Sequence, residues 1–170
     1  MDNKKTALNS LHKKYEAKLV SFAGYEMPIQ YSKGIIEEHK TTRENAGIFD
    51  VSHMGQLFIK GDDSLSKDLE RIFPAELNKA KLNQSKYSFL MNDEAGIHDD
   101  LIITKVESGF NIVLNAACKY SDFKLLSKLL VNKYEMVLSK ELSAVFLFSI
   151  LTLFYPSVCL PESFAPSARI

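Results

Sequence analysis

Apolar residues in several segments recur every three or four positions, which is the spacing of one face of a helix. This pattern predicts helices over residues 34–46, over 117–131 and between Asp62 and Pro74. Asp62 or Asp63 is placed to cap the last of these, and Pro74 ends it. Ser32 is expected to cap the first helix, and Gly47 to end it in the left-handed conformation that glycine tolerates. On the 117–131 helix, the inward residues are expected to be Phe123, Leu126, Leu129 and Leu130.

Other segments alternate between apolar and polar residues, as the strands of a half-buried sheet do. Such strands are predicted over residues 56–60, 86–91, 99–106, 110–114 and 134–138. Turn residues at 92–96 and 107–109 separate consecutive runs and predict hairpins. Residues 22–31 contain Gly24 and Pro28 and are expected to form a loop with buried aromatic side chains. This order of elements predicts the α+β class, with an antiparallel or mixed sheet and helices packed on one face.

The composition is that of a globular protein, and it argues against several kinds of site. The chain of 170 residues is long enough for one domain with a core. Its 21 basic and 21 acidic residues balance and give no electrostatic signal for nucleic acid. Cys118 and Cys159 form neither a Cys-x-x-Cys pair nor a spaced set with histidines, which argues against a zinc site or a disulfide framework and for a reducing compartment. No apolar segment follows the charged N-terminus, so no secretory signal is predicted.

Three blocks combine ionisable side chains with glycine, aromatic and β-branched residues. They are Phe-Ala-Gly-Tyr-Glu-Met-Pro-Ile-Gln-Tyr at 22–31, Gly-Ile-Phe-Asp-Val-Ser-His-Met-Gly-Gln at 47–56 and Gly-Ile-His-Asp-Asp-Leu at 96–101. In this order and at these separations, the chain resembles the aminomethyltransferase family, the tetrahydrofolate-dependent T-protein of the glycine cleavage system. The resemblance spans Thr6 to Ser143. It implies an incomplete folate-binding domain over residues 1–143, followed by an apolar, proline-containing tail over 144–170 that does not resemble the family.

The resemblance implies that a methylene group passes from the aminomethyl group of a lipoylated carrier protein to tetrahydrofolate, with release of ammonia. Asp100 matches the family's catalytic aspartate and would contact the folate near the nitrogens that accept the one-carbon unit. A fixed carboxylate suits the positive charge that develops as ammonia leaves. Because successive side chains of a strand point to opposite faces, Asp99 and Asp100 cannot share one proton, and only one of them faces the pocket. The alternative is that both are turn and cap aspartates.

Three further residues match folate contacts of the family. Tyr87 offers a flat face and one hydroxyl, although it could equally be a core aromatic residue. The amide of Asn115 could pair with the edge of the pterin ring, or it could cap a helix. The polarisable thioether of Met54 suits packing against flat rings.

Two other groups of residues contain side chains that can bind metals or act as nucleophiles, but their sequence spacing is not that of a metal site or a catalytic serine. His98 stands beside the aspartate pair, yet neighbours on a strand diverge and no further ligand follows at the right distance, so no metal site is expected. Ser52 and His53 are not part of a Gly-x-Ser-x-Gly turn, so a nucleophilic serine is not expected, and His53 is interpreted as structural.

Residues 142–160 carry no charge, and this run leaves three interpretations of the tail: a membrane anchor, a buried strand or helix of the domain, or the product of a changed reading frame near Ser143. The last is preferred. The Gln-Gly-Pro turn of the family is missing, so the chain is expected to have little or no turnover. The rival functions are a folate-binding accessory protein, the folate domain of a flavin-dependent demethylase and a non-functional fragment. The expected location is the cytoplasm, or the mitochondrial matrix in a eukaryote, without membrane association.

Overall fold

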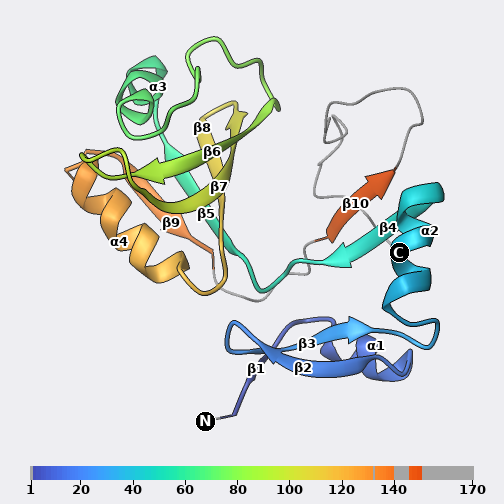
Figure 1. Ribbon diagram of the computed structural model, residues 1–170. Helices are drawn as coiled ribbons and strands as arrows, with labels where there is room; N and C mark the ends of the chain where they lie inside the picture. Colours follow the sequence, from blue (N-terminus) through green and yellow to red (C-terminus); the bar gives the residue numbers. More distant parts are fainter. Residues whose placement is uncertain (1, 132, 140–145, 151–170) are drawn as a thin grey trace. The chain divides into compact units, whose positions relative to one another are not determined.

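The computed structural model describes residues 2–131, 133–139 and 146–150, which form two compact units (Figure 1). The first unit contains the described residues up to His53 together with 146–150, and the second contains those from Met54 to Ser139. Helices and strands are mixed along the chain, and the sheets are antiparallel or mixed. The predicted α+β class is therefore confirmed.

The second unit is built on a five-stranded antiparallel sheet. Its strands lie in the order β6 (Ser85–Met91), β7 (Ile97–Val106), β8 (Gly109–Leu114), β5 (Gly55–Lys60) and β9 (Glu135–Leu138). Two helices accompany it, α3 (Asp63–Glu70) and α4 (Lys119–Leu129). Each strand lies within two residues of its predicted bounds, because the alternating pattern marks these segments clearly.

The core of this unit lies between the sheet and its helices. One cluster of buried side chains draws Leu65 and Leu69 from α3 and Leu126 from α4, together with residues of four strands. The strand members are Leu57, Ile59, Leu90, Leu101, Ile103, Phe110, Ile112 and Leu114. Since both helices feed the same cluster, they pack on the same face of the sheet, as predicted.

Neither α3 nor α4 packs on the other face of this sheet, which we call the helix-free face. It carries the residues that alternate with the core positions, namely Phe58, Tyr87, Phe89, Ile102 and Val113. Tyr87 is paired with Ile102, and Ile102 with Val113, so apolar side chains form a row across three strands.

The first unit contains two smaller sheets. Its elements are β1 (Lys4–Lys5), α1 (Asn9–Lys14), β2 (Lys18–Phe22), β3 (Tyr25–Gln30), α2 (Ile35–Glu44), β4 (Ala46–Asp50) and β10 (Phe146–Ile150). β3 pairs parallel with β1 and antiparallel with β2, while β4 pairs antiparallel with β10.

The expectation of a loop over residues 22–31 is wrong. Ala23 and Gly24, with φ of 49° and 81°, form a tight turn between β2 and β3. Pro28 is tolerated in β3 because β1 pairs only with Tyr25 and Glu26, so the missing N–H of Pro28 interrupts no bond to β1. Tyr25 is buried as expected, but Phe22 is exposed.

Three expectations about helix ends and faces are also wrong. α2 begins after Gly34, whose φ is 81°, and no side chain caps it, so Ser32 is not its cap. Gly47 lies in β4 opposite Ser149, because the helix has already ended at Asn45. Leu129 is 43% exposed, since Leu126 and Leu130 define the buried stripe of α4. The cap of α3 is as predicted: the Asp62 side chain accepts from the Ser64 N–H.

Part of the apolar run beyond Ser143 is a strand. The backbone of residues 146–150 pairs with all five residues of β4, which agrees with the interpretation of the run as an element of the domain. The remainder, over 151–170, lies outside the described residues, as do 142–145. Of the helices that the structure describes, none has the length and apolar character needed to cross a membrane.

Candidate functional site

Asp99 and Asp100 lie on β7, and their side chains take opposite directions. Asp100 Oδ2 accepts a hydrogen bond from the Tyr87 hydroxyl at 3.1 Å, on the helix-free face. Asp99 instead makes a side-chain hydrogen bond with Asp122 of α4, on the face where the helices pack. The expectation that the two side chains point to opposite faces of the strand is confirmed, whereas a ligand pocket on the Asp100 side stays a prediction.

Asn115 follows the end of β8 and joins both aspartates. Its Nδ2 lies 2.8 Å from Asp99 Oδ1, 3.1 Å from Asp100 Oδ1 and 3.2 Å from the Asp100 carbonyl oxygen. The residue at the N-cap of α4 is Cys118, and no side chain caps that helix. Asn115 therefore holds the carboxylates and does not cap a helix through its side chain.

Tyr87 is 62% exposed, so the alternative interpretation of Tyr87 as a core aromatic residue is wrong. The buried residues of β6 are Ser88 and Leu90, which alternate with Tyr87 and Phe89. The two rings meet edge to face, with centroids 5.3 Å apart. Desolvation, and then the hydrogen bond to Asp100, raise the pKa of the Tyr87 hydroxyl, so it stays protonated and donates to the carboxylate.

Met54 lies in the turn just before β5 and is half-buried. Gly55 pairs with Leu114, so Met54 is next to the end of β8 where Asn115 lies. The fold thus links Tyr87, Asp100 and Asn115 directly by hydrogen bonds and places Met54 at the same end of the sheet.

The sequence did not single out Asp122, which is only 5% exposed. Burial, and then the hydrogen bond and charge of Asp99, raise its pKa to about 7. The same surroundings, burial first and then the charges of Asp99 and Asp122, raise the pKa of the Cys118 thiol, which makes it a weak nucleophile. A signal for Asp122 did exist: it stands four residues before the inward Leu126, and therefore on the same face of the helix.

A second polar cluster lies in the first unit around Asp50. Asp50 Oδ2 accepts from Thr6 Oγ1 at 2.9 Å and contacts His12 Nε2 at 2.8 Å. His12 Nδ1 lies 2.8 Å from the Tyr31 hydroxyl, and the Ser52 hydroxyl bonds to Asp50 Oδ1. Burial alone would raise the pKa of Asp50, but the hydrogen bonds from Ser52, His12 and Thr6 lower it. This cluster ties together segments far apart in the sequence.

His53 belongs to the same unit and packs against aromatic rings. Its ring meets those of Phe22 and Tyr25 edge to face, with centroids 5.7 and 6.1 Å away. Asp50 contacts His12, and Ser52 directs its hydroxyl to Asp50. These contacts agree with a structural role for Ser52 and His53.

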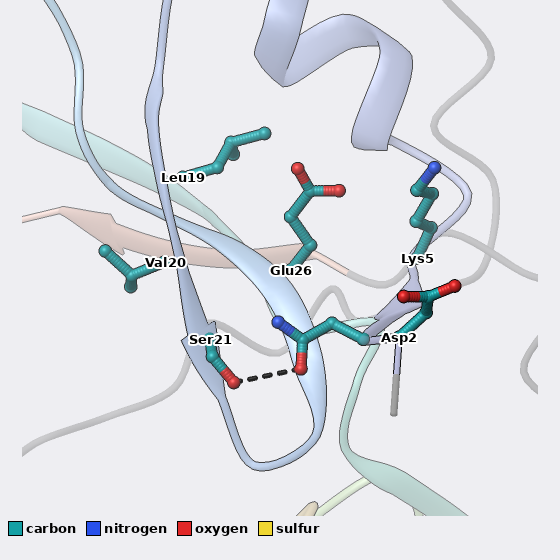
Figure 2. Close-up of a pocket in the computed structure, with 7 residues that line it drawn as sticks. Asp2, Lys5, Leu19, Val20, Ser21 and Glu26 are labelled. Carbon is teal, nitrogen blue, oxygen red and sulfur yellow. Dashed lines mark hydrogen bonds between the residues drawn. The ribbon is translucent and has the colours of Figure 1, made fainter.

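A hollow of about 630 Å³ lies beside the β1–β3–β2 sheet. Figure 2 shows residues that line it. Its lining consists of Asp2, Asn3, Lys5, Leu19, Val20, Ser21 and Glu26. Among these residues, Ser21 Oγ donates to Asn3 Oδ1 at 2.9 Å. None of the site residues predicted from the sequence is among the described residues that line this hollow, and none of those lining residues is aromatic. Within the described part of the chain, no three His, Cys, Asp or Glu side chains converge as a metal site requires.

Comparison with known proteins connects this arrangement to one family. Residues 8–150 match the model of the GCVT N-terminal domain. The chain belongs to this family. The mitochondrial aminomethyltransferase of Dictyostelium discoideum is 45% identical over 125 residues, which are 74% of this chain and 31% of that protein. The aminomethyltransferase of Clostridium botulinum strain Okra is 42% identical over 124 residues, which are 72% of this chain and 33% of that protein.

Comparison with solved structures points to the same family. A crystal structure of the glycine cleavage system aminomethyltransferase T from Bartonella henselae superposes with a TM-score of 0.78 and 35% sequence identity. The match covers 86% of this chain and 40% of that one. The chain thus spans about a third of the length of the curated relatives that it matches. The family match reaches residue 150, beyond Ser143 where the sequence resemblance was placed.

Proposed function

We propose that this chain carries the folate-binding and catalytic part of an aminomethyltransferase of the glycine cleavage system. Asp100 is the proposed catalytic residue, and Tyr87, Met54 and Asn115 are the proposed contacts of tetrahydrofolate. The observation that carries the proposal is the position of the Asp100 carboxylate, which is held by Tyr87 and Asn115 beside a row of apolar side chains.

The residues present suit a flat, nitrogen-rich ligand. Tyr87 and Phe89 offer aromatic surface on the helix-free face, and a heteroaromatic ring gains both buried area and stacking there. Asp100 and Asn115 supply an acceptor and an amide at the end of that surface. An acceptor at the edge of an aromatic platform can orient the ring nitrogens of the ligand.

In the proposed reaction, the methylene carbon loses its bonds to the sulfur and nitrogen of the aminomethyl carrier arm and gains bonds to two folate nitrogens. The two protons of those nitrogens leave with the thiol and the ammonia. Asp100 contributes a fixed negative charge close to the carbon that becomes positively charged. Tyr87 and Asn115 hold this carboxylate in one orientation before the reaction, which reduces the reorganisation that the transition state requires.

The donor in this proposal is the aminomethyl form of a lipoylated carrier protein, and the acceptor is tetrahydrofolate. The chain matches about a third of its relatives' length, so we expect it to bind the acceptor without efficient turnover. Binding and turnover therefore need separate measurements.

The test of binding uses the 170-residue chain, uniformly labelled with ¹⁵N and titrated with tetrahydrofolate. We expect the largest shift changes at the amides of Asp100 and Asn115, and weaker binding in Asp100→Asn. Asp93→Asn is the matched control, because Asp93 is an exposed aspartate in the turn before β7. Shift changes centred in the first unit, or equal binding by the two variants, would contradict the proposal.

The test of turnover is release of ammonia from the aminomethyl carrier protein in the presence of tetrahydrofolate. Release that Asp100→Asn abolishes would assign the chemistry to this chain. Binding without release in any preparation would favour the rival function, a folate-binding accessory protein.

A further inference from the structure

Asp99 and Asp122 form a pair of carboxyl groups on the side of β7 away from the proposed ligand. The two carboxyl groups are neighbours within hydrogen-bonding reach, and Asp122 is only 5% exposed. Each also has one oxygen, Oδ2, that is buried and receives no hydrogen from any donor in the described part of the chain. Two carboxylates both accept hydrogen bonds and repel each other, so this contact is favourable only when one proton lies between them.

The pair is connected to Asp100 by a short series of hydrogen bonds. Asp99 Oδ1 accepts from Asn115 Nδ2 at 2.8 Å and from the Asp100 N–H at 3.0 Å. Asn115 Nδ2 in turn reaches Asp100 Oδ1 at 3.1 Å. The orientation of Asp99 therefore sets the positions of the Asn115 amide and of the Asp100 backbone.

We propose that Asp122 is a positioning residue: its carboxyl proton, shared with Asp99, holds Asp99 and Asn115 in place and thereby orients the Asp100 carboxylate. Loss of this proton puts two negative charges together in a buried site, and one of the side chains must then move. Movement of Asp99 releases Asn115 and loosens Asp100. The consequence for ligand binding rests on the proposed function, whereas the proton sharing itself does not.

The groups around Asp122 determine when the proton leaves. Asp99 faces it from β7, and Cys118 precedes it at the N-cap of the same helix. Lys119, in the first turn of α4, is also buried, with its Cβ packed near Gly55 of β5. Burial and the Asp99 charge raise the Asp122 pKa to about 7, which places the loss of the proton in the neutral range. His98 is exposed on β7 next to Asp99 and is replaced in a control variant below.

The experiment follows the Asp100 backbone amide and the Asn115 side-chain amide by NMR from about pH 5 to about pH 9 without ligand. We expect both signals to shift with a midpoint near 7 in the wild type and to stay constant in Asp122→Asn, whose amide still donates to Asp99. Asp63→Asn, an exposed aspartate in the first turn of α3, is the matched control and should keep the transition. His98→Gln should keep it as well. A transition that persists in Asp122→Asn, or that disappears in His98→Gln, would overturn the proposal.

Two further measurements test the protonation of Asp122 directly and its effect on ligand binding. If Asp122→Asn does not fold, the ¹³C signal of the Asp122 carboxyl group in the wild type decides, and a midpoint near the ordinary value of 3.8 overturns the proposal. Tetrahydrofolate is then titrated at about pH 6 and about pH 8. We expect wild-type affinity to be about fivefold lower at the higher pH, as for the loss of one hydrogen bond, and Asp122→Asn to be unchanged. Absence of binding at both values would contradict the proposed function alone, because the amide titration needs no ligand.

Discussion

The side-chain amide of Asn115 holds the carboxylate of Asp100, with Nδ2 3.1 Å from Oδ1, while the same nitrogen lies 2.8 Å from Asp99 Oδ1. One neutral donor thus lies between two acidic side chains that point to different faces of the sheet. Such a donor reduces the repulsion between the carboxylates, and it fixes both of them relative to the end of β8.

Replacing Asn115 by aspartate removes the donor and adds a third carboxyl group. We expect the free energy of unfolding near pH 7 to fall by about 1–3 kcal/mol, as for other partly buried groups that lose their hydrogen-bond partner. The loss should be smaller at lower pH, where the introduced carboxyl group is protonated and can donate a hydrogen bond again. Urea denaturation of both proteins checks this. Asn111→Asp, at an exposed position of β8, is the control and should have almost no effect.

The ring and the hydroxyl of Tyr87 are expected to contribute separately to binding. Tyr87→Phe removes only the hydrogen bond to Asp100, so the affinity for tetrahydrofolate should fall by less than about fivefold. Tyr87→Ala also removes the aromatic surface and should weaken binding more. Calorimetric titration of the two variants separates these effects. Equal losses in both would mean that the ring does not contact the ligand.

Asp122 should make the stability of the protein depend on pH. The unfolded chain loses this proton near 3.8, whereas the folded protein keeps it to about 7. Between these two pH values the folded state binds more protons at Asp122 than the unfolded state does, so the free energy of unfolding falls as the pH rises. Above about pH 7 both states have lost the proton, and the contribution of Asp122 no longer changes. At about 1.4 kcal/mol per pH unit, the upper bound of the effect is about 4 kcal/mol.

Urea denaturation at a series of pH values, with wild type and Asp122→Asn, measures this contribution. The wild type should lose stability relative to the variant from about pH 4 to about pH 7, and the two curves should then run parallel. Parallel curves over the whole range would show that Asp122 keeps its ordinary pKa.

His12 should be a major source of stability in the first unit, because it is 4% exposed and contacts both Asp50 and Tyr31. His12→Ala removes one hydrogen-bond partner of the buried Asp50 carboxylate and leaves a cavity in place of the ring, and we expect a loss of about 2–4 kcal/mol in the free energy of unfolding. His39→Ala, an exposed histidine on α2, is the control and should change little. Native-state hydrogen exchange at the amides of β3 locates the loss in this unit.

The same cluster predicts sensitivity to acid. Its hydrogen bonds lower the pKa of Asp50, so the stabilisation is present above the ordinary value of 3.8 and is lost as the pH falls through the lower folded-state value. His12→Ala removes one of those bonds, and the acid transition measured by circular dichroism should move to higher pH. An unchanged midpoint would mean that the His12 contact does not stabilise the carboxylate.

Local patterns in the sequence predicted much of the second unit. The alternation over 86–91 and 110–114 defined two strands, and Asp62 was recognised as a cap, because both features depend on residues that are close in the chain. Gly24 and Pro28 misled the interpretation of 22–31, since a tight turn and the unpaired part of a strand tolerate the same residues as a loop.

The sequence by itself determined which segments are strands and helices in the second unit, which family the blocks resemble, and that Asp99 and Asp100 point in opposite directions. The tertiary structure alone decided which groups those side chains meet. Asp122 reaches Asp99 because α4 packs on one face of the sheet, and His12 reaches Asp50 across 38 positions of the chain. Periodicity reports the local backbone, whereas contacts between distant side chains depend on how the elements pack, and this packing determines the proton shared by Asp99 and Asp122.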